Sequence, residues 1–149
     1  MNTNDSANSE QHDAPENLSP PTLQFSEAEP TVPVGSCQEL DQMLHKAELR
    51  CVPGRPIVVS LYVHGHRLEI GLGLPKSFVC IQRCDPTPGP GFISIGNARA
   101  QWGANFFSHG WRRAEVPERN ILPATQARRV LREFFETGIR STSIDWEAL

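Results

Sequence analysis

The sequence lacks long hydrophobic runs. Its apolar segments fall well short of the roughly 18 consecutive residues that a membrane-spanning helix requires. The first residues, MNTNDSANSEQHD, show neither the basic start nor the apolar stretch of a secretion signal. We therefore expect a cytoplasmic protein without a membrane contact, and its 149 residues suggest one domain.

Basic residues are missing from the first 35 positions. This part of the chain contains six Asp and Glu residues and no Lys or Arg, so its formal charge is −6. The remainder carries 14 basic against 11 acidic residues, and this surplus of +3 is too small for the dense basic face of a nucleic-acid-binding protein. Because the segment is polar and contains Pro20 and Pro21, we expect a disordered acidic tail over residues 1–34. Residues 35–149 are expected to form a single domain.

The four cysteines lack the spacing of a zinc site. Cys80 and Cys84 are close together, but Cys37 and Cys51 do not form the second close pair that such a site requires. Thiols in the cytoplasm stay reduced, and free cysteine usually packs as a small apolar residue. We expect buried or half-buried thiols and no metal.

A catalytic signature is also lacking. The glycine-rich stretch at 71–75 leads into residues typical of a strand, whereas a phosphate-binding loop leads into a helix. No spacing selects a nucleophile, a base and the group that orients the base. We therefore predict a protein that is not an enzyme and has no cofactor or small-molecule ligand. Two alternatives stay open: a small metal-dependent enzyme that uses His64, His66 and His109, and a generic adaptor subunit.

Hydrophobic periodicity predicts an α+β fold. Ser36 and Glu39 form a capping box for a helix over residues 36–49, where apolar residues recur at helical spacing. The middle of the chain shows short β-branched, aromatic or alternating segments bounded by turn residues. We predict strands at 57–63, 67–72, 77–82, 91–95, 104–109 and 111–116. Since strands and helices do not alternate, we expect an antiparallel sheet of about five to seven strands with two main helices.

The second helix is the clearest element in the sequence. Pro123 suits its first turn. Gly138 is predicted to end the helix in a left-handed conformation, with Ile139 folding back on the last turn. The residues of its apolar face are Ala127, Val130, Leu131, Phe134 and Phe135.

Trp146 stands three residues from the C-terminus, where chains usually fray. Such a large side chain is expected to be buried, and Ile144 points the same way if this segment is a strand. We expect both residues to close over the core. On that view Trp146→Ala lowers the free energy of unfolding by about 3–5 kcal/mol.

The stretch WGANFFSHGWRRAE, residues 102–115, concentrates aromatic side chains between glycines and polar residues. Alternate residues of a strand face inward, so we expect Phe107 and one of the two tryptophans in the core. Other members can form a partner surface, because aromatic residues dominate the energetics of protein interfaces.

Residues 91–149 contain an ordered series of short motifs. It begins with Gly-Phe-Ile-Ser-Ile-Gly at 91–96, an aromatic-polar strand at 105–109, Ala-Glu-Val-Pro at 114–117 and Leu122-Pro123. It continues with Ala127, Phe134, Thr137-Gly138, Arg140 and Ile144-Asp145-Trp146. In this series the chain resembles bacterial immunity proteins of polymorphic toxin systems, specifically their first numbered family, which includes inhibitors of DNA-cytosine-deaminase toxins. Ser141 stands where that family commonly has proline, which implies a looser turn.

The resemblance implies a non-catalytic inhibitor that binds a cognate toxin domain and blocks its active site. A toxin that acts on nucleic acid is expected, with a cytosine deaminase first and a nuclease second. The residues that we expect on the toxin-binding surface are Asp85, Trp102, Asn105, His109, Trp111 and Glu115. The residues that we expect to be structural in the family are Ala127, Phe134, Gly138 and Trp146.

Overall fold

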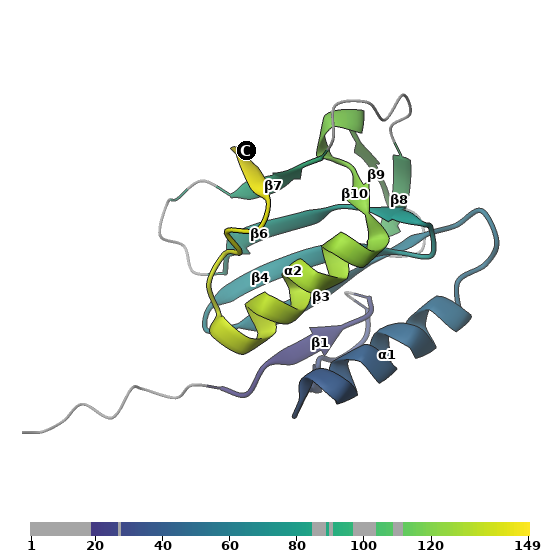
Figure 1. Cartoon of the computed structure of the whole chain (residues 1–149). Coiled ribbons are helices and arrows are strands. Elements are labelled where there is room, and N and C mark those ends of the chain that lie inside the picture. The colour runs from purple at the N-terminus through teal and green to yellow at the C-terminus, as the bar shows by residue number, and fades with distance from the viewer. Residues whose placement is uncertain (1–18, 27, 85–88, 90, 97–103, 109–111) are drawn as a thin grey trace, which may run out of the picture.

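The computed structural model describes residues 19–26, 28–84, 89, 91–96, 104–108 and 112–149. Seven strands form an antiparallel path through its main sheet (Figure 1). Their order across the sheet is β11 (Asp145–Ala148), β7 (Phe92–Ile95), β6 (Val79–Arg83), β4 (His66–Leu72), β3 (Ile57–Val63), β1 (Thr22–Gln24) and β2 (Val32–Pro33). A hairpin of β8 (Ala104–Ser108) and β9 (Arg112–Val116) joins β3 through one parallel bridge. The predicted α+β fold is confirmed.

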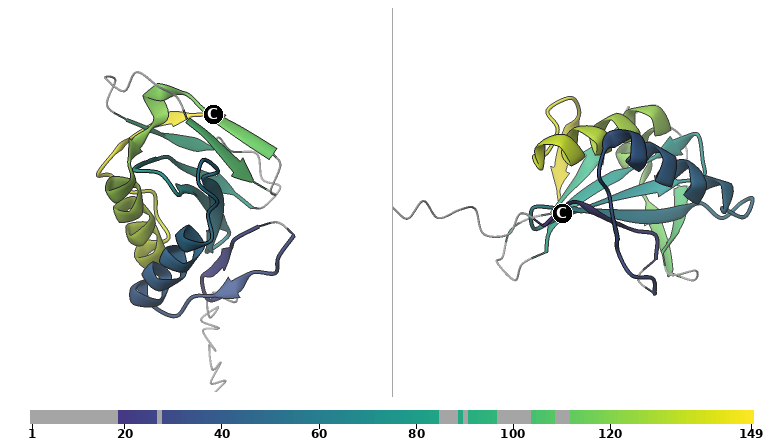
Figure 2. Two further views of the ribbon diagram at one scale, coloured as in Figure 1. Left: turned by 90° about the vertical axis from the view of Figure 1, so that its right-hand side faces the viewer. Right: turned by 90° about the horizontal axis from the view of Figure 1, so that it is seen from below.

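Two helices, α1 (Cys37–Leu49) and α2 (Ala124–Thr137), cover one face of this sheet (Figure 2). The predicted cap of α1 forms, because the Ser36 hydroxyl accepts a hydrogen bond from the Glu39 amide at 3.1 Å. The Glu39 carboxylate in turn accepts from the Gly35 amide at 3.0 Å, one residue earlier than a standard capping box. Together the two hydrogen bonds fix the residue at which the helix begins.

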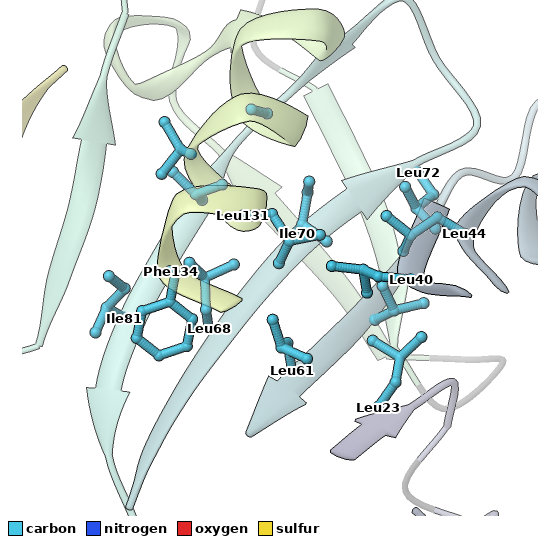
Figure 3. Packing of buried hydrophobic residues seen from close by; sticks show 14 of the residues in the cluster. Leu23, Leu40, Leu44, Leu61, Leu68, Ile70, Leu72, Ile81, Leu131 and Phe134 are labelled. Carbon is cyan, nitrogen blue, oxygen red and sulfur yellow. The ribbon is translucent and has the colours of Figure 1, made fainter. Parts of the chain in front are cut away.

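The main core lies between the helices and the sheet (Figure 3). Leu40 and Leu44 of α1 are buried there, as are Leu131 and Phe134 of α2. The predicted alternation in β4 is confirmed, because its apolar residues at 68, 70 and 72 are all buried on the helix side. Burial of these side chains removes apolar surface from water, which is the main force that holds the two layers together.

The expected boundary of the tail at residue 34 is wrong. Strands β1 and β2 both lie before residue 35, and Leu23 is fully buried in the main core. Val34 is buried in the same cluster. The polar average composition of this segment predicts a tail, but a few apolar residues at the right register suffice to add strands to a sheet edge. The remaining tail residues, 1–18, lie outside the described part of the chain.

The β3–β4 connection is a tight turn between two of the predicted strands. Val63 and His66 are paired, which leaves the two residues His64 and Gly65 in the loop. Both have positive φ, 48° and 77°, as a two-residue hairpin turn of type I′ requires. This turn fixes the register of the two central strands.

The C-terminal segment confirms one expectation about the end of α2 and contradicts another. Gly138 adopts φ 67° and its amide donates to the Phe134 carbonyl at 2.7 Å, so the left-handed stop is confirmed. The expectation that Ile139 folds back on the helix is wrong, because its side chain is 69% exposed. Ile144 is buried, and Trp146 is half-buried against the main core. The indole of Trp146 donates to the Ser141 carbonyl at 2.8 Å.

Trp146→Ala is expected to lower the free energy of unfolding by about 2 kcal/mol, less than the 3–5 kcal/mol typical of a fully buried tryptophan. Part of this loss comes from the ring contacts and part from the hydrogen bond to Ser141. Urea unfolding followed by circular dichroism measures the change. Trp146→Phe keeps much of the packing and should lose about half as much. An unchanged midpoint for Trp146→Ala would show that β11 does not depend on this ring.

Candidate functional site

The β8–β9 hairpin places two of the predicted contact residues side by side. Asn105 pairs with Glu115 across the two strands, and both residues are exposed. Their neighbours Phe106 and Val116 are buried. Because successive residues of a strand point to opposite faces, the hairpin has one face packed on the protein and one face presented to solvent.

The packed face of the hairpin rests in a cradle that depends on glycine. The Phe106 ring lies over Gly71 of β4, and a Cβ atom at position 71 would overlap the ring. Phe78 meets the same ring edge-on, with centroids 5.0 Å apart and an interplanar angle of 62°. Together with Val58, Val116 and others they form a second hydrophobic cluster on the sheet face opposite the helices. The hairpin is thus attached by a large side chain inserted against backbone.

A polar clamp fixes the chain directly after β9. Asn120, in a short 3-10 helix (Glu118–Asn120), is buried, and its side-chain amide donates to the Ser94 carbonyl of β7 at 2.8 Å. The Ser94 hydroxyl returns a bond to the Asn120 carbonyl at 2.8 Å and accepts from the Val79 amide at 3.2 Å. Buried polar groups satisfied in this way hold a unique geometry. Sequence reasoning missed both residues, because no local pattern marks a contact between positions 26 residues apart.

The connection from β4 to the next strand holds Gly71, the residue on which the Phe106 ring of the hairpin rests. Residues 73–75 of the glycine-rich stretch connect β4 to β5 (Lys76–Ser77), and Gly73 has φ 106°. Strand β5 pairs with β10 (Leu122–Pro123), just before α2. The buried Ser77 hydroxyl donates to the Gly71 carbonyl at 2.7 Å. This hydrogen bond holds Gly71, the residue under the Phe106 ring, against the strand that follows the turn.

A polar network shares the hairpin side of the sheet. Arg67 donates to the Gln82 side chain at 2.8 Å and forms an ion pair with Glu69 at 2.9 Å. Tyr62 donates to Gln24 at 2.9 Å. Burial lowers the pKa of Arg67, but Glu69 and Tyr62 raise it by more, and the net shift is upward. These half-buried side chains form a rigid polar surface of low net charge.

The other predicted contact residues are not placed by the structure. Asp85, Trp102, His109 and Trp111 lie outside the described residues. The side chain of Phe107, expected in the core, also lies outside the described residues, whereas Phe106 is described and buried.

The residues expected to be structural lie on the other side of the sheet. Ala127 and Phe134 are buried in the main core. Gly138 ends α2, and Trp146 belongs to β11.

The cysteines and histidines give no sign of a reactive centre in the described ranges. None of the four cysteines, all of which lie in the described ranges, forms a disulfide, and Cys84 is exposed although half-buried or buried thiols were expected. Burial raises the pKa of the Cys80 thiol to about 11, so it stays protonated at neutral pH. Within the described chain, no group of three His, Cys, Asp or Glu residues could hold a metal ion. His64 packs against Gly138 instead.

No helix in the described part of the chain is both long and apolar enough to cross a membrane. Among curated proteins, none matches the chain. The model of a protein family, immunity protein Imm1, matches residues 28–148. This match extends the C-terminal resemblance to the central strands and α1, and it begins before residue 35. Because it covers most of the sequence, the chain belongs to the Imm1 family of immunity proteins, non-enzymatic inhibitors that neutralise a cognate toxin.

Proposed function

We propose that the protein neutralises its toxin by covering the toxin's active site with the exposed face of the β8–β9 hairpin. The family supplies the class of partner. The observation that carries the proposed contact is the exposed Asn105–Glu115 pair on a hairpin whose other face is anchored by Phe106. A preformed surface loses little conformational entropy on binding, and this favours high affinity.

The proposed contact also includes the aromatic residues next to these strands in the sequence. Trp102 precedes β8, while His109 and Trp111 lie between β8 and β9. Asp85 follows Cys84 at the end of β6. Tryptophan is enriched among the residues that dominate binding energy, so Trp102 and Trp111 are the proposed anchors.

We further propose that the toxin acts on nucleic acid, as a cytosine deaminase in the first instance. The C-terminal motifs support this, because the family they resemble includes inhibitors of such toxins. Enzymes that bind nucleic acid tend to have basic active-site clefts, and a carboxylate such as Glu115 speeds association with a basic partner. The encounter is proposed to take place in the cytoplasm.

Co-expression tests the proposal directly. The toxin-type reading frame immediately upstream is expected to kill the host when expressed alone and to be tolerated with this protein. If the toxin is a deaminase, uracil accumulates in host DNA only without the inhibitor. DNA fragmentation without uracil would identify a nuclease. Survival that does not change with this protein would contradict neutralisation of that toxin.

Glu115→Lys is expected to weaken binding of the purified, inactivated toxin domain by about tenfold, equivalent to about 1.4 kcal/mol. The change removes a carboxylate from the centre of the proposed contact and places a positive charge opposite a basic partner. Association should therefore slow most at low salt, where charges are least screened. Surface plasmon resonance measures both rates. Glu29→Lys makes the same charge change at an exposed site between β1 and β2. Equal effects of the two substitutions would argue against a contact at Glu115.

A further inference from the structure

A groove is lined by residues from the C-terminal end of α2, the end of β6 and the start of β7. It has a volume of about 470 Å³ and is lined by residues that include His66, Arg83, Phe92, Phe134, Ile139 and Arg140. A second hollow of about 520 Å³ shares three of these residues, at 92, 139 and 140, and reaches Trp146. We call the two together the α2 groove.

The floor of the α2 groove is apolar and accessible. Ile139 is 69% exposed although it directly follows the helix stop, where an apolar residue usually packs back on the helix. Phe92 and Trp146 are half-buried beside it. An exposed isoleucine next to two aromatic rings is a surface that a partner can cover with a gain in apolar burial.

Arg140 stands at the rim of the α2 groove. The Arg140 guanidinium lies 3.8 Å from the centroid of the Phe92 ring and 6.0 Å from the Trp146 ring. Arg83 and His66 line the groove as well, and Asp145 is the single carboxylate among its described lining residues. Stacking holds the Arg140 side chain in place, so little freedom is lost when it meets an anion.

We infer that the α2 groove is a second contact for the cognate toxin, and that it takes a toxin segment in which an apolar side chain stands beside a carboxylate. The apolar side chain covers Ile139 and Phe92, and the carboxylate pairs with Arg140. An apolar centre with charged residues at the rim is the usual anatomy of a protein interface. Toxin is the occupant because neutralisation of a toxin is the function of the family, and the inference rests on that function.

The α2 groove is separate from the hairpin contact. In β6, Ile81 lines the groove, whereas its neighbour Cys80 belongs to the cluster under the hairpin. Adjacent residues of a strand face opposite sides of a sheet, so the apolar floor of the groove and the cluster under the hairpin lie on opposite faces. Their contributions to affinity are therefore expected to be independent, and substitutions in the two sites should add in free energy.

Binding of the purified, inactivated toxin domain to single variants tests the inference. Ile139→Asp and Arg140→Glu are each expected to weaken the affinity by about tenfold or more, as for residues that dominate an interface. The Arg140→Glu effect should shrink as salt rises from about 0.05 to 0.5 M, because charges are screened, while the Ile139→Asp effect persists. Leu49→Asp is the control for an exposed apolar residue, at 73% exposure, and Arg129→Glu is the control for an exposed arginine on α2.

Three outcomes separate this inference from the function on which it rests. If wild-type protein does not bind or neutralise the toxin, both fail. If wild-type protein binds, Glu115→Lys weakens binding, and both groove variants stay within about twofold of wild type, the groove inference alone is overturned. The same conclusion follows if the control variants weaken binding as much as the groove variants. Circular dichroism melting confirms that each variant is folded.

Discussion

Replacing Gly96 by alanine is expected to lower the free energy of unfolding by about 3 kcal/mol, at the upper end for an overpacked site. A Cβ atom at this position would overlap the carbonyl oxygen of Ile121. The obstacle is backbone, which cannot rotate away as a side chain does. The Gly96 amide also donates to the Arg119 carbonyl at 2.6 Å, so moving the chain apart costs a hydrogen bond. Urea unfolding followed by circular dichroism gives the free-energy change.

Gly89→Ala is the matched control for this substitution. Among the described residues, a Cβ atom there meets the flexible Arg83 side chain at 3.5 Å, an ordinary contact distance, and no backbone. We expect a change within about 0.5 kcal/mol. If Gly96→Ala were as stable as Gly89→Ala, the close approach of β7 to the chain after β9 would be refuted. The Asn120–Ser94 clamp would then no longer account for the position of the hairpin.

Helices and central strands were predictable because their signals are local. The apolar face of α2 recurs at helical spacing from Ala127 to Phe135, and Gly138 marks the end of the helix by a backbone conformation that other residues rarely adopt. The β3–β4 hairpin is likewise marked by its two-residue turn at 64 and 65. In each case the residues that decide the structure lie within one short segment, so that segment alone is enough to predict it.

Contacts between distant segments could not be predicted in this way. Leu23 is buried only because β1 pairs with β3, and nothing in its polar surroundings indicates that pairing. The same holds for Asn120, which meets Ser94 only after β7 and the chain following β9 come together. Trp146 is less buried than expected, because β11 is an edge strand of the sheet and part of the ring stays exposed there.

The candidate site was also predictable only in its local features. An aromatic-polar hairpin was predictable from its alternating pattern, but its register decides which residues share a face. The pairing of position 105 with 115 puts Asn105 and Glu115 together, and it puts Phe106 on the packed face. A slip of one residue would exchange the two faces, so the burial of Phe106 depends on this register.

Phe106→Ala is expected to lower the free energy of unfolding by about 4 kcal/mol, as for other fully buried phenylalanines. The ring fills the space between Gly71 and Phe78, and its loss leaves a cavity that the backbone cannot close. Toxin binding should weaken as well, because Asn105 and Glu115 then lose their fixed position. Urea unfolding measures the first effect and surface plasmon resonance the second. Asn105→Ala, on the exposed face, should change stability by less than about 0.5 kcal/mol.

A double-mutant cycle decides whether the cradle is the cause. Gly71→Ala alone should be strongly destabilising, since the new methyl group overlaps the Phe106 ring. In the Phe106→Ala background the ring is absent and the methyl group enters the cavity, so the same substitution should cost little or even stabilise. The two changes must therefore couple by more than about 1 kcal/mol. Additive effects would mean that Phe106 is buried elsewhere, and the hairpin would then have no rigid support for a preformed binding face.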